Sequence, residues 1–169
     1  MPGEMVFILA LHYLSKTFHV MVKIFFLSFL TIANVSDAFS QINSDNIIGR
    51  WMSMENNLEV EVFKCGNQYK AIVLWFDDSD DKSRPMNKRC DSKNPVASLR
   101  IHKIIGLEVM HGLVYDSDDD EWENGRIYDS STGKDWNAKA WLTNDGVLKV
   151  RGFWHFEFLG KNISFKRVS

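Results

Sequence analysis

The segment from Trp122 to Trp136 restricts the possible folds more than any other part of the sequence. It reads WENGRIYDSSTGKDW, and its first half, Trp122–Tyr128, has the composition of a β-strand. Asp129–Gly133 favours a turn, because Asp and Ser accept hydrogen bonds from nearby backbone N–H groups and Gly tolerates positive φ. The chain then returns through Lys134–Leu142, where apolar residues occupy every second position. The segment therefore predicts a hairpin with a tryptophan at each end, and hence a β protein.

The chain on both sides of this hairpin has the same pattern of strands and turns. Leu58, Val60 and Val62 alternate with glutamates, which is typical of an antiparallel strand with one buried face. Further strands are expected at Ile47–Met54, Tyr69–Phe76, Leu107–Tyr115, Val147–Phe156 and Ile163–Val168. About eight short strands and no helical pattern predict an all-β antiparallel barrel or a sandwich. We expect the barrel, whose interior at this size is filled by side chains or holds one small ligand.

Residues 1–40 have the composition of a targeting leader rather than of a folded domain. Lys23 precedes the apolar run 24–33, and residues 38–40 place small side chains at the positions that signal cleavage requires. The apolar run is too short to span a bilayer comfortably. We therefore predict cleavage before Gln41 and export to the periplasm or the medium, with an uncleaved N-terminal anchor as the alternative.

Within this leader, residues 1–20 are compatible with an over-long start, because the following methionine begins a complete signal by itself. The mature part, residues 41–169, is long enough for one modest core and is predicted to be a single domain without a membrane span.

The charge balance argues against two classes of partner. The formal net charge is −2, and the leader carries equal numbers of acidic and basic residues, so cleavage leaves the balance unchanged. A nucleic-acid-binding domain is usually strongly basic, so we expect no nucleic-acid partner. The balance likewise does not indicate a basic face for anionic lipid.

The sequence contains two cysteines, Cys65 and Cys90. In an exported protein an even number of cysteines favours a disulfide, and we expect one between these two residues. Two unpaired thiols are the alternative. No Cys-x-x-Cys spacing indicates a redox or metal pair.

Gly49-x-Trp51 in the first expected strand, together with Arg167 in the last, resembles the signature of lipocalins and their relatives. The resemblance implies an eight-stranded barrel of the lipocalin (calycin) type. It also implies that the arginine packs across the tryptophan and closes one end of the barrel.

Residues 49–168 also resemble a bacterial family of small exported domains of unknown function. The motifs are Cys65-Gly66, Asp91-x-x-Asn94-Pro95, Gly106-Leu107, Trp122-x-x-Gly125-x-Ile127-Tyr128-Asp129-x-x-x-Gly133-Lys134, Leu148-Lys149-Val150-Arg151-Gly152 and Leu159-Gly160…Phe165-x-Arg167-Val168. Trp136 and Phe165 depart from the family pattern, but both positions stay aromatic. The resemblance implies architecture and export, and no activity comes with it.

Two carboxylates stand in segments that favour turns. Asp129, with Gly133, is expected to cap its turn by accepting N–H groups of Ser131 or Thr132, with an acid/base role as the alternative. Asp91, with Asn94 and Pro95, is expected to fix the long loop 77–96, with contact to a ligand as the alternative. We expect no metal, because the acidic loop 116–121 lacks the glycine and the glutamate of a calcium loop. No cofactor-binding motif is present.

The aromatic residues supply the candidate ligand-binding site. Trp75, Trp136, Tyr128 and Trp154 are expected to line a pocket, or else to fill the barrel core. Arg151 lies mid-strand among apolar residues. If its side chain points inward it must be paired or meet an anionic group; the alternative is an outward, solvated side chain.

These observations favour an exported barrel that binds a small apolar or amphipathic molecule. The first alternative is a filled barrel that acts as a partner-binding or envelope-structural module. The second is a hydrolase using Asp129, Arg151 and a loop carboxylate, so enzymatic activity is left open and considered the less favoured reading.

Overall fold

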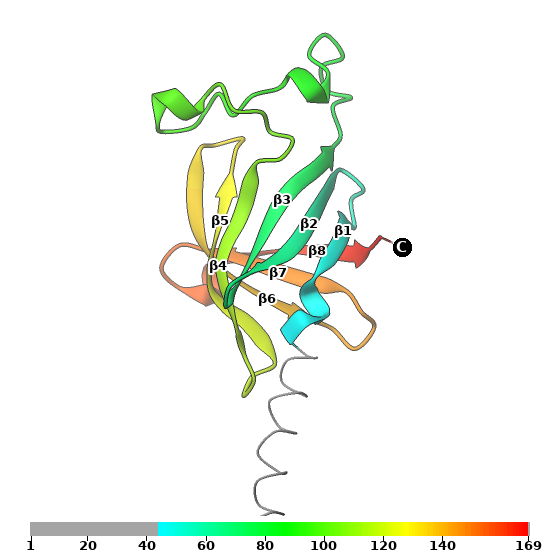
Figure 1. Cartoon of the computed structure of the whole chain (residues 1–169), viewed down its shortest axis with the longest axis vertical. Helices are drawn as coiled ribbons and strands as arrows, with labels where there is room; N and C mark the ends of the chain where they lie inside the picture. The colour runs from blue at the N-terminus through cyan, green and yellow to red at the C-terminus, as the bar shows by residue number, and fades with distance from the viewer. Residues whose placement is uncertain (1–43, 169) are drawn as a thin grey trace, which may run out of the picture. The chain divides into compact units, whose positions relative to one another are not determined.

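The computed structural model describes residues 44–168, and the predicted leader, residues 1–40, lies outside the described residues. The described chain contains eight strands (Figure 1). They are β1 (Gly49–Ser53), β2 (Leu58–Cys65), β3 (Gln68–Phe76), β4 (Glu108–Asp116), β5 (Glu121–Asp129), β6 (Lys134–Leu142), β7 (Leu148–Phe153) and β8 (Lys161–Arg167). Four short 3-10 helices, which the sequence pattern did not predict, are η1 (Asp45–Ile47), η2 (Met86–Lys88), η3 (Ala97–Leu99) and η4 (Glu157–Leu159).

The strands form one closed antiparallel barrel in chain order, from β1 to β8. Each strand pairs with the next, and the pairs Trp51–Arg167 and Ser53–Phe165 between β1 and β8 close the ring. The predicted hairpin is the β5–β6 pair, in which Ile127 lies opposite Trp136. The predicted all-β barrel is therefore confirmed.

One end of the barrel, here the closed end, is plugged by η1. Ile47 of this helix is fully buried against Trp51 and Trp122. The indole N–H of Trp51 donates to the carbonyl of Ile47 at 2.8 Å, and that of Trp122 donates to Ser44 at 3.0 Å. Because both N–H groups have partners, the two large rings are buried without an unsatisfied donor.

Arg167 completes the closed end. Its guanidinium carbon lies 4.3 Å from the centre of the Trp51 ring, and its N–H groups donate to the carbonyls of Ile48 and Asn46. A Cβ at Gly49 would stand 2.6 Å from the Arg167 guanidinium. Glycine at this position therefore leaves room for the arginine, and the structure brings Gly49, Trp51 and Arg167 together as the lipocalin resemblance implies.

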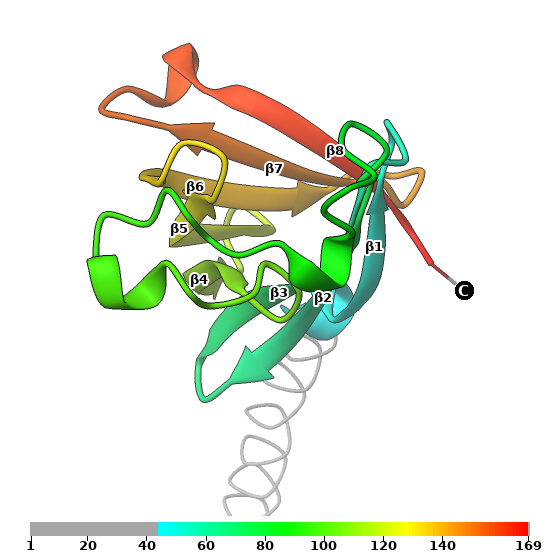
Figure 2. The same ribbon diagram turned by 90° about the horizontal axis from the view of Figure 1, so that it is seen from above.

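The opposite end, here the open end, carries the β1–β2, β3–β4, β5–β6 and β7–β8 connections. The long β3–β4 loop crosses this end, as the view from above shows (Figure 2). At the open end, the barrel wall is shortest at β1. The β1–β8 ladder stops at the pair Ser53–Phe165, whereas β8 begins at Lys161 and therefore extends farther toward the open end. The inner face of β8 therefore extends beyond the cover of β1.

The predicted disulfide is wrong: Cys65 and Cys90 are free thiols. Cys65 ends β2 beside the β2–β3 turn, whereas Cys90 lies in the loop that follows the other end of β3. A nine-residue strand such as β3 is roughly 30 Å long. A disulfide requires Cα atoms within about 7 Å, so two cysteines at opposite ends of this strand cannot be joined.

Candidate functional site

The inner surface of the barrel becomes less buried toward the open end. Val150 on β7 is 7% exposed and belongs to the core, and its cross-strand partner on β8 is Ile163. Residues directly opposite each other in an antiparallel pair project on the same face of the sheet, so Ile163 also faces inward. Its exposed fraction is nevertheless 40%. An inward-facing side chain that solvent reaches shows that the inner surface is accessible beside the short strand β1.

Three further apolar residues lie at this level on the inner face. Leu58 and Ile127 are partly buried against the core, and Trp136 lies opposite Ile127. The ring of Trp136 meets that of Trp154 edge-on with centroids 5.7 Å apart. Trp154, 59% exposed, therefore stands on the rim of the open end next to the inward-facing Trp136.

Trp75 is not part of this apolar surface. The register between β2 and β3 shifts at Glu59/Val60, so that Leu58 pairs with Phe76 and Glu59 with Trp75. Because partners share a face, Phe76 takes the inward position with Leu58, and Trp75 lies on the outer face with Glu59. Trp75, which was expected to line the pocket or fill the core, therefore lies on the outer face, because the bulge adds one residue to β3.

Tyr128 fixes the β3–β4 loop instead of lining the interior. Its hydroxyl donates to Asp91 at 2.8 Å, and the amide of Asn94 donates to the second oxygen of the same carboxylate at 2.7 Å. Asp91 is 1% exposed, and no basic side chain among residues 44–168 forms a salt bridge with it. The pKa of Tyr128 is raised to about 12, mainly by burial and secondly by the hydrogen bond to Asp91. The phenol therefore stays protonated and continues to donate its hydrogen bond.

The β5–β6 turn contacts the same loop. Asp129 accepts hydrogen bonds from the backbone N–H of Ser131 at 2.9 Å and from the hydroxyl of Thr132 at 2.7 Å. Burial opposes ionisation of Asp129, but these hydrogen bonds outweigh it and lower its pKa. Gly133 has φ +71°, and a Cβ there would stand 2.0 Å from the carbonyl oxygen of Lys93. The glycine thus permits close contact between the turn and the loop.

Asp91, Asn94, Tyr128 and Gly133 therefore form one cluster, here called the loop latch. Pro95 follows directly in the chain. The motifs around Asp91 and Tyr128 lie 37 residues apart in the sequence, and their side chains meet in the folded barrel. The sequence contained both motifs, but no spacing rule indicated that they would pair.

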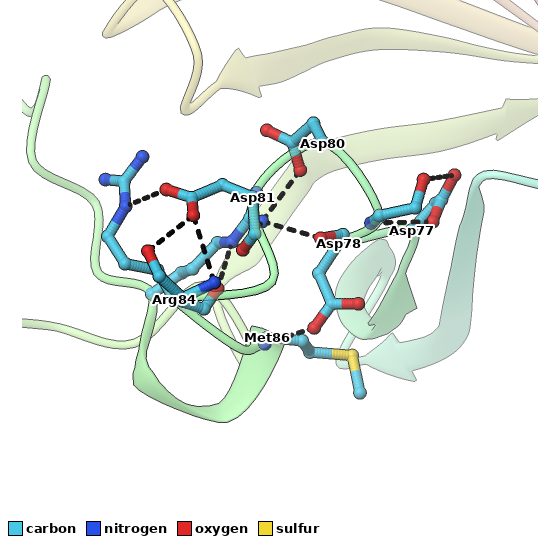
Figure 3. A network of polar contacts seen from close by, with 9 residues as sticks. Asp77, Asp78, Asp80, Asp81, Arg84 and Met86 are labelled. Carbon is cyan, nitrogen blue, oxygen red and sulfur yellow. Dashed lines mark hydrogen bonds and ion pairs between the residues drawn. The ribbon is translucent and has the colours of Figure 1, made fainter.

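The first part of the β3–β4 loop, residues 77–81, is acidic, and two arginines form ion pairs with it (Figure 3). Arg89 donates to Asp80 at 2.7 Å and stacks over Phe76, with its guanidinium carbon 5.6 Å from the ring centre. Arg84 donates to Asp81 at 2.7 Å. The pKa of Asp81 is lowered to about 2, mainly by hydrogen bonding from Ser83 and secondly by hydrogen bonding from Arg84. These contacts hold the first half of the loop over the inward-facing Phe76.

Arg151 lies on the outer surface. Its neighbour Val150 is buried in the core, while Arg151 donates to the carbonyl of Glu157 at 2.7 Å and to Asn162 at 2.9 Å. The side chain therefore points outward, which was the alternative considered from the sequence. Its hydrogen bond to Glu157 holds η4 against the outer surface of the barrel. Arg151 is therefore not a ligand-binding residue of the interior.

A hollow of about 480 Å³ lies next to η4. Its lining residues include Asn124, Arg126, Asn137, Lys139, Phe153 and Glu157. Lys139 is engaged by Glu121 at 2.8 Å and by Glu157 at 2.7 Å, and these hydrogen bonds raise its pKa. Arg126, Asn137, Lys139 and Phe153 lie on the outer face of β5, β6 and β7, and Glu157 belongs to η4, so this hollow opens on the outside of the barrel.

The described part of the chain offers neither a metal cluster nor a membrane-spanning helix. No group of three or more His, Cys, Asp or Glu side chains within residues 44–168 is placed to hold a metal ion. In the same residues, no helix is both long and apolar enough to cross a bilayer.

A closed antiparallel barrel of eight strands, with an arginine over a tryptophan at one end and an accessible apolar surface at the other, defines a lipocalin-like protein. The chain belongs to the family described as "Uncharacterized protein conserved in bacteria (DUF2147)", whose model matches residues 49–167. Both resemblances noted in the sequence are thereby confirmed.

A solved structure supports the same class. Protein HP1028 from the human pathogen Helicobacter pylori, described as belonging to the lipocalin family, is 19% identical in sequence and has a TM-score of 0.61. The match covers 73% of this chain and 83% of that one. This similarity establishes the shared fold. No curated protein matches the chain significantly.

Proposed function

We propose that the protein is exported and binds a small apolar or amphipathic molecule at the open end of its barrel. The observation that carries this proposal is Ile163, which faces inward opposite a core valine and yet is 40% exposed. Barrels of about eight strands hold one small ligand when their interior is not completely filled.

The chemistry of the surface favours an apolar group on the ligand. Leu58, Phe76, Ile127, Trp136 and Ile163 all face inward at this end, and none of them offers a charged group. Ligand sites of this kind combine an apolar lining with a few polar groups at the entrance. The Arg89 guanidinium lies over Phe76 and the Trp154 indole lies against Trp136, so both offer polar groups beside the lining, and this combination favours an amphipathic molecule.

The proposal is tested by filling the open end. N-phenyl-1-naphthylamine, an apolar fluorescent probe, is titrated into the wild type, into Ile163→Trp and into Val168→Trp. Val168 is 37% exposed and follows the last strand, so its variant is a matched control for an added indole. We expect the wild type and V168W to bind the probe and I163W to bind it at least about tenfold more weakly. Equal binding by all three would place the probe elsewhere, and no binding by any of them would favour the filled, partner-binding barrel.

Export is supported by the composition of residues 1–40. N-terminal sequencing of protein recovered from the periplasm or the medium tests it, with Gln41 expected as the first residue. A mature N-terminus upstream of residue 35 would contradict cleavage before Gln41.

A further inference from the structure

Large apolar side chains are exposed on two connections of the barrel. The β7–β8 connection exposes Trp154, Phe156, Phe158 and Leu159, and the segment around η3 exposes Val96, Leu99 and Ile101. Phe158 is 75% exposed and Ile101 is 76% exposed. Clusters of exposed apolar side chains often mark an interaction site. These seven residues are here called the apolar rim.

Both parts of the apolar rim project on the same side of the barrel. Figures 1 and 2 show η3 and η4 on the same side in both views, with the β5–β6 turn between them. A flat partner can therefore touch both connections at once.

The two segments that carry the rim contain more basic than acidic residues. Lys93, Arg100 and Lys103 are exposed and alternate with the apolar residues near η3, and Lys161 follows η4. Asp91 is the one acidic residue between Arg84 and Lys103, and it is buried in the loop latch. Glu157, the acidic residue of the β7–β8 connection, is paired with Lys139 at 2.7 Å.

The acidic β4–β5 turn lies at the opposite end of the barrel (Figure 1). This turn, residues 116–121, contains Asp116, Asp118, Asp119, Asp120 and Glu121. The net charge of −2 therefore conceals an uneven distribution of charge, with a cluster of acidic residues at the closed end and basic residues beside the apolar rim. At the open end, the acidic residues Asp80 and Asp81 are paired with Arg89 and Arg84.

We propose that the apolar rim docks the protein onto an anionic lipid bilayer. Exposed Trp and Phe rings prefer the boundary between headgroups and acyl chains, and Leu, Ile and Val insert beside them. Each Lys or Arg near an anionic surface adds to the attraction. The acidic closed end then points away from the membrane, which fixes the orientation of the barrel. This docking does not depend on the proposed ligand, although it would bring the open end close to the lipid.

The observations favour lipid over a protein partner. The rim consists of two separate connections, and basic residues are interspersed among its apolar side chains. Lipid headgroups and acyl chains accommodate such a discontinuous surface without requiring a complementary shape. The proposal predicts that loss of either connection weakens binding, and that salt weakens it as well.

Cosedimentation with vesicles tests the docking. Protein purified from its own compartment is mixed with vesicles of equal parts phosphatidylglycerol and phosphatidylethanolamine, and separately with phosphatidylcholine vesicles. We expect the wild type to sediment with the anionic vesicles, and to do so less at about 1 M NaCl, where the Debye length is about 3 Å. Phe158→Glu and Ile101→Glu should each lower the partition coefficient by about tenfold or more.

Met54→Glu is the matched control, because Met54 is 50% exposed and lies on the β1–β2 turn, outside the apolar rim. It adds the same charge, and we expect it to retain most of the binding.

Brominated phosphatidylglycerol should quench the tryptophan fluorescence of the wild type. The variant Trp154→Phe should lose most of this quenching but should still sediment with the vesicles. A wild type that stays in the supernatant overturns the proposal, as does an equal loss of binding in M54E. Capture of a specific protein without vesicle binding would show instead that the rim binds a protein.

Discussion

At the scale of single residues, the loop latch depends on a buried carboxylate that hydrogen bonds stabilise without a salt bridge. Tyr128 and Asn94 each donate to one oxygen of Asp91. A buried acceptor that loses one donor costs about 1–3 kcal/mol, and more when the acceptor is charged. The latch is therefore sensitive to changes as small as the removal of one hydroxyl.

The first prediction concerns Tyr128→Phe, which removes only that hydroxyl. We expect the free energy of unfolding in urea at pH 7 to fall by about 1–3 kcal/mol. The pKa of Tyr128 is raised to about 12 in the folded protein, against about 10 in unfolded chains. The stabilisation is therefore fully present below pH 10 and is lost as the pH rises from 10 to 12. The difference between wild type and variant should shrink over that range, and a constant difference would contradict the assigned hydrogen bond.

Residue-level predictions from the sequence succeeded where the local pattern decides the structure. Asp129 accepts from Ser131 and Thr132 within its own turn, and such contacts follow from neighbouring residues alone. Trp75 shows the limit, because one bulge between β2 and β3 turns its side chain to the other face. Nothing in an apolar run such as Tyr69–Phe76 marks where a bulge occurs.

At the scale of elements, the contact between the β5–β6 turn and the β3–β4 loop requires a residue without a side chain. Gly133 combines φ +71° with a position 2.0 Å from the Lys93 carbonyl oxygen for any added Cβ. Gly146 in the β6–β7 turn has a similar φ, +78°, but nothing within 4 Å of its Cβ position. Alanine at either position would be strained by the positive φ, but only alanine at position 133 would also collide with a neighbouring atom. Comparing the two positions therefore distinguishes backbone strain from steric contact.

The second prediction compares Gly133→Ala with Gly146→Ala. Placing alanine at positive φ costs about 1 kcal/mol or more in both variants. G133A additionally forces the loop away from the turn, so its loss of unfolding free energy should exceed that of G146A by more than about 1 kcal/mol. Hydrogen exchange should show faster exchange around Asp91 in G133A alone. Equal destabilisation, with unchanged exchange in both, would mean that the turn does not hold the loop.

The arrangement of elements was predictable because strand periodicity and turn residues are local signals. The state of the cysteines was not predictable in this way. An even number of cysteines suggests a disulfide, but it does not show that the two thiols lie at opposite ends of β3. The latch was hidden for a related reason, since Asp91 and Tyr128 meet only once the barrel closes. Long-range pairing therefore had to come from the structure.

At the scale of the whole molecule, the two ends of the barrel differ in packing and in charge. The closed end buries Trp51, Trp122 and Ile47 completely, and the open end leaves inward-facing Ile163 accessible. Truncating a core tryptophan to alanine costs about 3–5 kcal/mol, so the closed end supplies much of the stability. The open end is then free to carry a ligand site and a docking surface. Net charge and composition did not indicate this division, because both average over the two ends.

Native mass spectrometry of protein purified from its own compartment shows whether the open end of the barrel holds a ligand. We expect the wild type to carry one small molecule per chain that is released on unfolding, and we expect Ile163→Trp purified in parallel to carry little or none. Bare protein mass for the wild type under gentle conditions, or equal loading of I163W, would contradict a ligand site at the open end.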